Sequence, residues 1–225
     1  LAIIPARLGS KGIPNKNWRD LAGVSPVQRA YEVALAVGCL PIVISTDLDL
    51  TPDEIAPDRY LHAPAPLHTD TCPMIDVVRD VLARVPGPPE QIVVLLQPTQ
   101  PLRTPAHVEA AIQLLIDGAR SVVSVTPATS PDKLWRAPRQ DGLVIPWRDP
   151  YVVERRQDAR PAFRADGTVY AWRRHQGYWD WPFTPLLIPQ DETCPLDTPA
   201  DWAEAERRLR DRSGHPAIAE SQRDG

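Results

Sequence analysis

The segment LAIIPARLGSKGIPNKN, residues 1–17, joins a short apolar run to a basic loop. The run Leu1 to Pro5 predicts a buried strand. The loop from Arg7 to Asn17 contains two glycines and three cations, which are Arg7, Lys11 and Lys16. A buried strand followed at once by such a loop is typical of an α/β sheet that binds a ligand at the carboxyl ends of its strands.

The chemistry of this loop suits a row of phosphates. Glycine lets the backbone approach a ligand closely, so that N–H groups can point at it. Arg7 can hold two phosphate oxygens, whereas Lys11 and Lys16 act as point charges. The loop has neither the Walker spacing nor the dinucleotide-binding glycine pattern. Its residues alone leave two interpretations open, a phosphate-binding loop and a solvated loop with scattered cations.

Beyond this loop, apolar strands alternate with helical patterns. The expected helices are 26–37, 75–85 and 105–116, and the expected strands are 39–45, 92–96 and 121–125. Near-continuous apolar strands between helices predict an α/β fold with a mostly parallel sheet covered on both faces. Three polar segments, 7–17, 46–47 and 97–103, would meet at the carboxyl ends of the strands, where such sheets bind ligands.

The alternation breaks in the second half of the chain. An excursion from the sheet is expected at about 127–163, and it carries seven cations between Lys133 and Arg160. Strands are expected again at 168–173 and 185–189. Thr198 then predicts the N-cap of a last helix that reaches about Arg212. We therefore expect one domain over 1–213 and a flexible tail over 214–225.

Composition bounds the class of protein. The chain has 225 residues, of which 43% are hydrophobic, and a net charge of −4, which suits one α/β domain. This charge gives no reason to expect a nucleic-acid or membrane partner, and no apolar run approaches the ~20 residues of a membrane helix. The three cysteines, Cys39, Cys72 and Cys194, are odd in number and far apart, so a disulfide framework and a zinc site are not expected. A reducing cytoplasm is the expected location.

Four segments, in order, resemble the acylneuraminate cytidylyltransferases, the CMP-sialic acid synthetase family. IIPARLGSKGIPNKN (3–17) is similar to the opening signature of that family. LLQPTQPLRT (95–104) resembles its LLQPTSPLR segment, and PAFRADGTVY (161–170) resembles its AFRPNGAIY segment. LDTPADWAEAE (196–206) resembles its ending, DIDTxxDLxxAE. The resemblance covers nearly the whole chain.

The resemblance implies a Rossmann-like three-layer sandwich, a homodimer whose dimerisation arm is the excursion, CTP as donor and Mg²⁺ as cofactor. The usual acceptors are acidic nine-carbon sugars, and a sister family uses an eight-carbon acid. By position, the residues expected to contact CTP are Arg7, Ser10, Lys11, Lys16, Asn17 and Asp70. The residues expected at the acceptor are Gln97, Arg103 and Arg164, and Asp197 is the expected metal ligand. The expected catalytic set is Lys11, Arg7, Asp197 and Gln97.

The chain also departs from the family pattern. The family ending has two aspartates two residues apart, whereas here Pro195 takes the first place and only Asp197 remains. Asp191 and Glu192 are nearby candidates to replace the missing carboxylate. In the segment APAPLHTDTCPM (63–74), Asp70 is kept but the residues at 72–74 are no longer small. The donor side is therefore better retained than the acceptor side.

The expected function is transfer of CMP from CTP to an acidic acceptor, a nonulosonic or ulosonic acid or a related acid, with release of pyrophosphate. Two alternatives stay open, a cytidylyltransferase for a small phosphonate and a non-catalytic nucleotide-binding relative. Each residue also has a structural interpretation. Gln97 would only cap a strand end, Asp197 would only precede a helix cap, and Arg164 would pair with Asp166 or Glu154.

Overall fold

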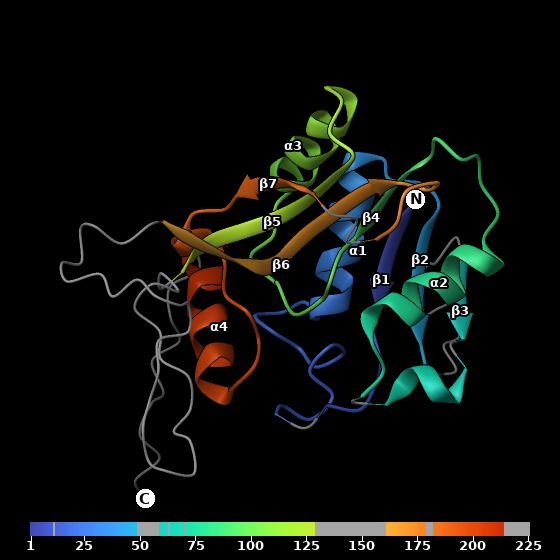
Figure 1. Ribbon diagram of the computed structural model, residues 1–225. Helices are drawn as coiled ribbons and strands as arrows, with labels where there is room; N and C mark the ends of the chain where they lie inside the picture. The colour runs from blue at the N-terminus through green and yellow to red at the C-terminus, as the bar shows by residue number, and fades with distance from the viewer. Residues whose placement is uncertain are drawn as a thin grey trace, which may run out of the picture.

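The computed structural model describes residues 1–10, 12–48, 59–62, 64–69, 71–128, 161–178 and 182–213 (Figure 1). The described strands are β1 (Ala2–Pro5), β2 (Ile42–Thr46), β3 (Arg59–His62), β4 (Ile92–Leu95), β5 (Ser121–Ala128), β6 (Ala162–Arg173) and β7 (Thr184–Leu187). The described helices are α1 (Pro26–Val37), η1 (Ala65–His68), α2 (Met74–Arg84), α3 (Pro105–Ile116), η4 (Gln190–Glu192) and α4 (Pro199–Ser213). Within these ranges, no helix is both long enough and apolar enough to cross a membrane.

The described strands form a seven-stranded sheet in the order β3-β2-β1-β4-β6-β5-β7. β1 pairs in parallel with β2 and β4, β2 with β3, and β5 with β7. Only β6 among the described strands runs antiparallel to its neighbours, β4 and β5. The prediction of a mostly parallel α/β sheet is confirmed, and β6 is the strand that brings the chain back from the excursion.

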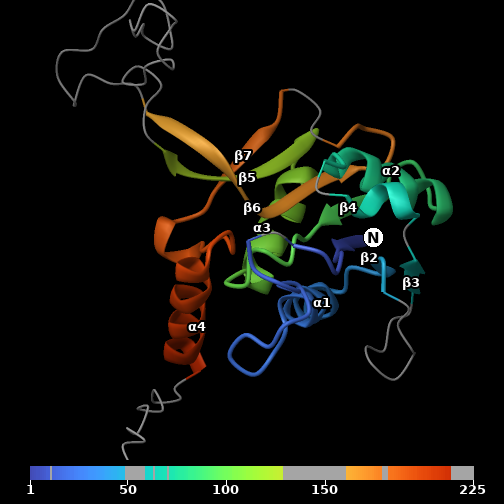
Figure 2. The same ribbon diagram turned by 90° about the horizontal axis from the view of Figure 1, so that it is seen from below.

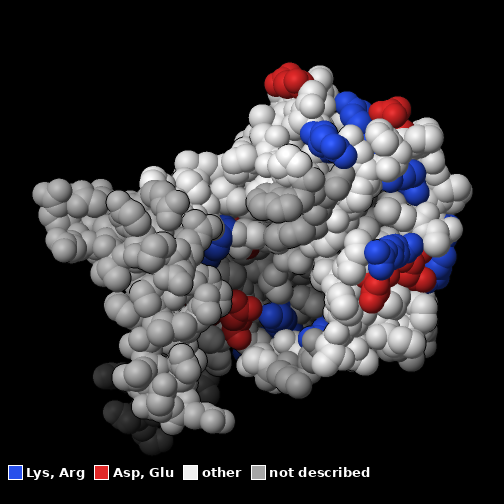
Figure 3. Space-filling view, viewed as in Figure 1, with Lys and Arg blue, Asp and Glu red and all other residues white. Residues whose placement is uncertain are grey.

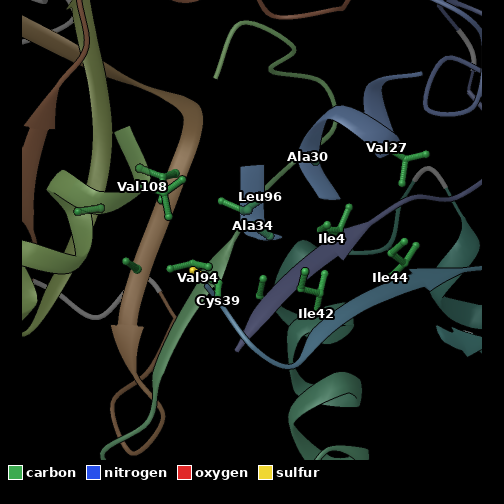
Figure 4. Packing of buried hydrophobic residues seen from close by; sticks show 14 of the residues in the cluster. Ile4, Val27, Ala30, Ala34, Cys39, Ile42, Ile44, Val94, Leu96 and Val108 are labelled. Atoms are coloured by element: carbon green, nitrogen blue, oxygen red, sulfur yellow. The ribbon is translucent and has the colours of Figure 1, made fainter. Parts of the chain in front are cut away.

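Helices cover both faces of the sheet, so the fold has three layers. α1 and α3 pack against one face, where Ala30 and Val108 meet Ile4, Ile44 and other strand residues (Figure 4). α2 covers the opposite face, and Figure 2 shows it on the other side of the sheet from α1 and α3. β1 is buried on both faces, because Ile3 packs in the core on the side of α2 and Ile4 packs in the core on the side of α1.

Local sequence signals begin and end the helices as expected. The Ser25 side chain accepts a hydrogen bond from the backbone N–H of Gln28, and Pro26 opens α1. Thr198 caps α4 by accepting from the N–H of Asp201, whose carboxylate accepts in return from the Thr198 N–H at 2.8 Å. This confirms the predicted N-cap of the last helix and fixes Asp197 directly before it.

The structure also differs from the sequence prediction. The strand β3 is not predicted by any sequence pattern, and it pairs with β2 at the edge of the sheet. The excursion is shorter than expected at both ends, because Pro127 of β5 pairs with Phe163 of β6. The rest of the excursion, the tail, Lys11 and Asp70 lie outside the described residues.

A bulge interrupts β6 opposite β5. Val123 pairs with Tyr170 and Val125 with Ala165, so residues 166–169 loop out opposite Ser124. The Asp166 carboxylate holds this loop, since it accepts from the Ser124 hydroxyl at 2.5 Å and from the N–H and hydroxyl of Thr168, both at 2.9 Å. Within the bulge, Gly167 has a φ of +81°, a left-handed conformation that glycine adopts without steric cost.

Candidate active site

Two adjoining hollows lie at the carboxyl ends of the parallel strands. The first hollow, of about 250 Å³, follows β1, β2 and β4 and is lined by Arg7, Lys16, Asn17, Ser45, Asp47, Cys72, Met74, Gln97, Thr99 and neighbouring residues. In Figure 3 the surface is hollowed between α4 and α2, and basic and acidic side chains lie together there. This is the edge of the sheet at which the sequence predicted a ligand.

The loop after β1 is braced on several sides. The N–H of Ala6 donates to the Ser45 carbonyl at 2.8 Å, and the N–H of Leu8 donates to the Asp47 carboxylate at 2.6 Å. The Asn17 amide donates to the Arg7 carbonyl at 2.9 Å. The backbone that carries Arg7 is therefore fixed from β2 on one side and from its own loop on the other.

Lys16 joins this loop to the segment before α4. Its ammonium donates to the Leu196 carbonyl at 2.7 Å and lies 4.0 Å from the Asp197 carboxylate. Burial lowers the pKa of Lys16, and the charge of Asp197 opposes this shift. Gly12 allows the loop to approach the segment before α4 closely, because a Cβ at this position would lie 2.5 Å from the Asp197 carbonyl oxygen. Lys16 and Asp197 are distant in sequence and nevertheless belong to one site.

Two buried polar atoms in the first hollow have no hydrogen-bond partner within the described residues. They are Oδ1 of Asn17 and Oγ of Ser45, in residues that are 6% and 4% exposed. Buried polar atoms are nearly always paired, because leaving one unpaired costs about 1–3 kcal/mol. Both residues line the hollow, and their unpaired atoms suit a ligand that is polar.

The second hollow, of about 240 Å³, adjoins the first. It is lined by Gln97, Thr99, Gln100, Arg164, Ala165, Asp166, Gly167, Tyr170, Thr193, Pro195 and Asp197. Gln97 and Thr99 line both hollows, so the two share a wall. This arrangement can hold two small molecules with their reacting groups next to each other.

Arg164 presents a charge to the second hollow. Its side chain is exposed, and its guanidinium makes no hydrogen bond or ion pair within the described part of the chain. The alternative that Arg164 pairs with Asp166 does not describe this structure, because that carboxylate bonds Ser124 and Thr168 instead. Glu154, the other alternative partner, lies outside the described residues. The position of Arg164 suits an anionic group of a ligand.

Arg103 is placed differently from the expectation. It is 7% exposed, lines neither hollow, and donates to the backbone carbonyls of Gln97 (2.6 Å) and Thr168. Burial lowers its pKa to about 9, with Asp166 opposing the shift, so the guanidinium is charged at neutral pH. The interpretation of Arg103 as a direct acceptor ligand is therefore corrected, because its donors are used to hold the walls of the second hollow.

The carboxylates around the second hollow are few. Asp197 has a side chain that is 73% exposed, and the described residues contain no group of three or more His, Cys, Asp or Glu side chains arranged for a metal ion. Asp191 and Glu192 line neither hollow, and Glu192 bonds His107 at 2.7 Å. Their placement gives no support to the expectation that they replace the carboxylate missing at Pro195.

Some residues of the two hollows are marked by the sequence and others are not. Asp47, Cys72 and Met74 stand out in the sequence, and all three line the first hollow. Ser45 is predicted only as a strand residue, and no sequence signal marks its hydroxyl as unpaired. Thr193 carries no signal either, because its role depends on a contact with Gln100 across 93 residues. Ser10, in contrast, is expected at the nucleotide but lines neither hollow.

Comparison with known proteins identifies the family. The family profile described as cytidylyltransferase matches residues 1–180. The chain belongs to the cytidylyltransferase family. It is 32% identical over 226 residues to the CMP-N,N′-diacetyllegionaminic acid synthase of Legionella pneumophila, covering 93% of this chain and 95% of that protein. The resemblance found in the sequence motifs is thereby confirmed.

A second relative and a solved structure are also similar to the chain. An N-acylneuraminate cytidylyltransferase of Streptococcus agalactiae is 30% identical over 177 residues, which are 76% of this chain and 42% of that longer protein. A solved structure of a CMP:2-keto-3-deoxy-manno-octonic acid synthetase complexed with CTP has a TM-score of 0.67 at 20% identity, covering 94% of this chain and 98% of that one. This likeness shows that the chain has the fold of that synthetase. The family match and the similarity to the Legionella synthase show that the chain is a CTP-dependent cytidylyltransferase.

Proposed function

We propose that this cytidylyltransferase transfers CMP from CTP to an acidic sugar of the sialic, legionaminic or octulosonic type. The observation that carries the proposal is the pair of hollows that share Gln97 and Thr99, one beside the basic loop and one beside Arg164. The first hollow suits CTP, because Arg7 and Lys16 can neutralise a triphosphate. The second suits an acid, because Arg164 can bind its carboxylate. The names of the relatives support the same class of acceptor.

The reaction follows from this placement. An acceptor hydroxyl gives its proton to water, and its oxygen forms a bond to the α-phosphorus of CTP. The bond from this phosphorus to pyrophosphate breaks, and its electron pair leaves with pyrophosphate. Lys16 and Arg7 stabilise the charge that grows on the phosphates. Gln97, in the shared wall, orients the acceptor against the α-phosphate.

The proposal includes Mg²⁺, and Asp197 is the residue that would hold it. Magnesium prefers oxygen ligands and is commonly bound by one or two carboxylates together with substrate phosphates and water. The exposed Asp197 carboxylate, 4.0 Å from the Lys16 ammonium, fits this pattern with a single protein ligand. When bound there, the metal would neutralise phosphate charge and lower the pKa of the acceptor hydroxyl. Such a site depends on the nucleotide for its remaining ligands.

Two further parts of the proposal concern assembly and location. A homodimer is proposed from the family resemblance, with the excursion at 127–163 as the arm. A cytoplasmic location is proposed because the three cysteines are all free thiols, as a reducing compartment maintains them. Size-exclusion chromatography with light scattering tests the first, and a mass of twice 25.0 kDa is expected.

The acceptor class is tested by pyrophosphate release. The purified chain is incubated with CTP, Mg²⁺ and one acid at a time: N-acetylneuraminate, N,N′-diacetyllegionaminate, 3-deoxy-manno-octulosonate or a small phosphonate. Turnover with at least one sugar acid is expected, with formation of the matching CMP-sugar seen by mass spectrometry. Turnover of the phosphonate alone would favour the alternative substrate class. Calorimetric CTP binding without any turnover would favour a non-catalytic relative.

The lowered pKa of Lys16 leads us to expect that CTP binding depends on pH. Because burial lowers the pKa of Lys16 below 10.5, the ammonium loses its proton at a lower pH than an exposed lysine does. The protonated form binds the phosphates, so CTP affinity is complete below this pKa and falls as the pH rises through it. We expect a loss of up to about tenfold, the contribution of one charge-assisted hydrogen bond. Calorimetry over a pH series from neutral to alkaline measures it.

The matched variant for this prediction is Lys16→Arg. A guanidinium keeps its charge across the whole range, so the affinity of this variant should vary much less with pH. If the two proteins lose affinity in parallel, another group is responsible for the pH dependence.

A further inference from the structure

Gln100 and Arg103 reach from the loop after β4 to the bulge in β6. Residues 166–168 lie in the bulge and have no register partner on β5, and their buried carbonyls need donors from elsewhere. Arg103 donates to the Gly167 carbonyl at 3.5 Å and to the Thr168 carbonyl. The amide of Gln100 donates to the third carbonyl, that of Asp166. The side chains of Gln100 and Arg103 thus donate to all three carbonyls of residues 166–168.

The oxygen of the same Gln100 amide faces the opposite wall of the second hollow. It accepts from the Thr193 hydroxyl at 3.0 Å, and the two residues are 3% and 6% exposed. Close by, the N–H of Leu196 donates to the Thr99 carbonyl at 3.0 Å. One buried amide therefore joins the bulge of β6 to the segment that runs from Thr193 to Asp197.

This link connects the two charged groups of the second hollow. Arg164 lies two residues before the Asp166 carbonyl, and Asp197 lies four residues after Thr193. The packing around the link is tight, because a Cβ on Gly167 would lie 2.7 Å from the Gln97 side-chain oxygen and 3.7 Å from Gln100. A shift of either wall would change the separation of Arg164 and Asp197.

We propose that Gln100 is a positioning residue for the acceptor, because its amide fixes the wall that carries Arg164 relative to the wall that carries Asp197. The proposal rests on the proposed function. In the family segment LLQPTSPLR this position is a serine, whose hydroxyl is too short to bond both walls at once. Pro195 also stands where the family ending has a carboxylate, and the segment around it is held by the hydrogen bond from Thr193 to Gln100.

The test compares variants of both partners with the acid that supports turnover. Gln100→Ala is expected to raise the acceptor KM about tenfold, as loss of two buried hydrogen bonds allows, with CTP Kd unchanged. Thr193→Val should give part of this effect, and Thr193→Ser should restore wild-type KM because it keeps the hydroxyl. Gln113→Ala is the matched control, since the Gln113 amide bonds Asp117 on the exposed face of α3, away from both hollows.

A second measurement is independent of turnover. Hydrogen exchange of the Leu196 amide should become faster in Gln100→Ala and stay unchanged in Gln113→Ala, because the Thr193–Asp197 segment loses its link to the bulge. Unchanged exchange together with an acceptor KM within about twofold of wild type would overturn the role of Gln100. A fall in melting temperature and kcat without a change in acceptor KM would also overturn it. Absence of turnover in the wild-type protein with every acid would instead reject the proposed function, and the exchange result would then decide the link alone.

Discussion

Replacing Asp197 by alanine is expected to lower kcat about 10²–10³-fold while leaving CTP affinity in the absence of Mg²⁺ within about threefold. The physical reason is that Asp197 offers an exposed carboxylate in the lining of the second hollow, 4.0 Å from the Lys16 ammonium of the first hollow. Its negative charge does not help an anionic nucleotide to bind, so it contributes through the metal that it would hold. Steady-state kinetics with the best acid and calorimetry with CTP measure the two effects.

The control for this prediction is Asp191→Ala. Asp191 is also exposed and precedes the same segment, but it lines neither hollow, so kcat should stay within about twofold of wild type. The metal is followed directly by the electron paramagnetic resonance of Mn²⁺ with CTP present, and binding should weaken only in the Asp197 variant. Equal turnover of Asp197→Ala and wild type would reject Asp197 as the metal ligand. A loss in Asp191→Ala would return that residue to the site.

The sequence predicted the parts of the fold that depend on local patterns. Apolar runs and caps predicted α1, α3 and α4 closely, because periodicity and residues such as Ser25 and Thr198 act within one or two turns. β3 was missed, since its four residues carry no clear alternation and pair only at the edge of the sheet. The excursion was predicted to begin and end too close to the sheet, because β5 and β6 still pair at Pro127 and Phe163. This pairing depends on the register of β6, which no local pattern indicates.

The site was predictable where its residues share one loop and less so where it depends on packing. Arg7, Lys16 and Asn17 come from one loop after one strand, and all three line the first hollow. The position of Asp197 beside Lys16 required the family motif, because nothing in the spacing of residues 16 and 197 indicates a contact. The role of Gln100 could not be predicted for the same reason, as its two partners are distant in sequence.

The different roles of Arg103 and Arg164 could not be predicted from the sequence either. Arg103 and Arg164 both belong to family motifs, and both were expected at the acceptor. Only burial separates them, since the guanidinium of Arg103 is used by backbone carbonyls and that of Arg164 faces the second hollow. A motif gives the type of residue, but not the direction of its side chain. The two residues should therefore respond differently to the same substitution.

Replacing Arg103 by alanine is expected to lower the free energy of unfolding by about 3–5 kcal/mol, because several buried carbonyl oxygens lose their donor at a cost of about 1–3 kcal/mol each. The variant would leave the carbonyls of Gln97, Gly167 and Thr168 without this side-chain donor. Urea denaturation followed by circular dichroism measures the loss. Because the bulge would also relax, activity should fall even in the folded fraction, through a raised acceptor KM.

Arg164→Ala is the matched variant, since it removes the same side chain from an exposed position two residues before the bulge. It should leave the free energy of unfolding within about 0.5 kcal/mol of wild type, as expected for an exposed residue without buried contacts. Its acceptor KM should nevertheless rise about 10–100-fold, because a charge-assisted bond to the carboxylate of the acid is lost. If instead Arg103→Ala proved as stable as wild type and Arg164→Ala bound the acid normally, neither arginine would have the role that its burial and contacts indicate. The pair of variants thus separates support of the hollow from recognition of the acid.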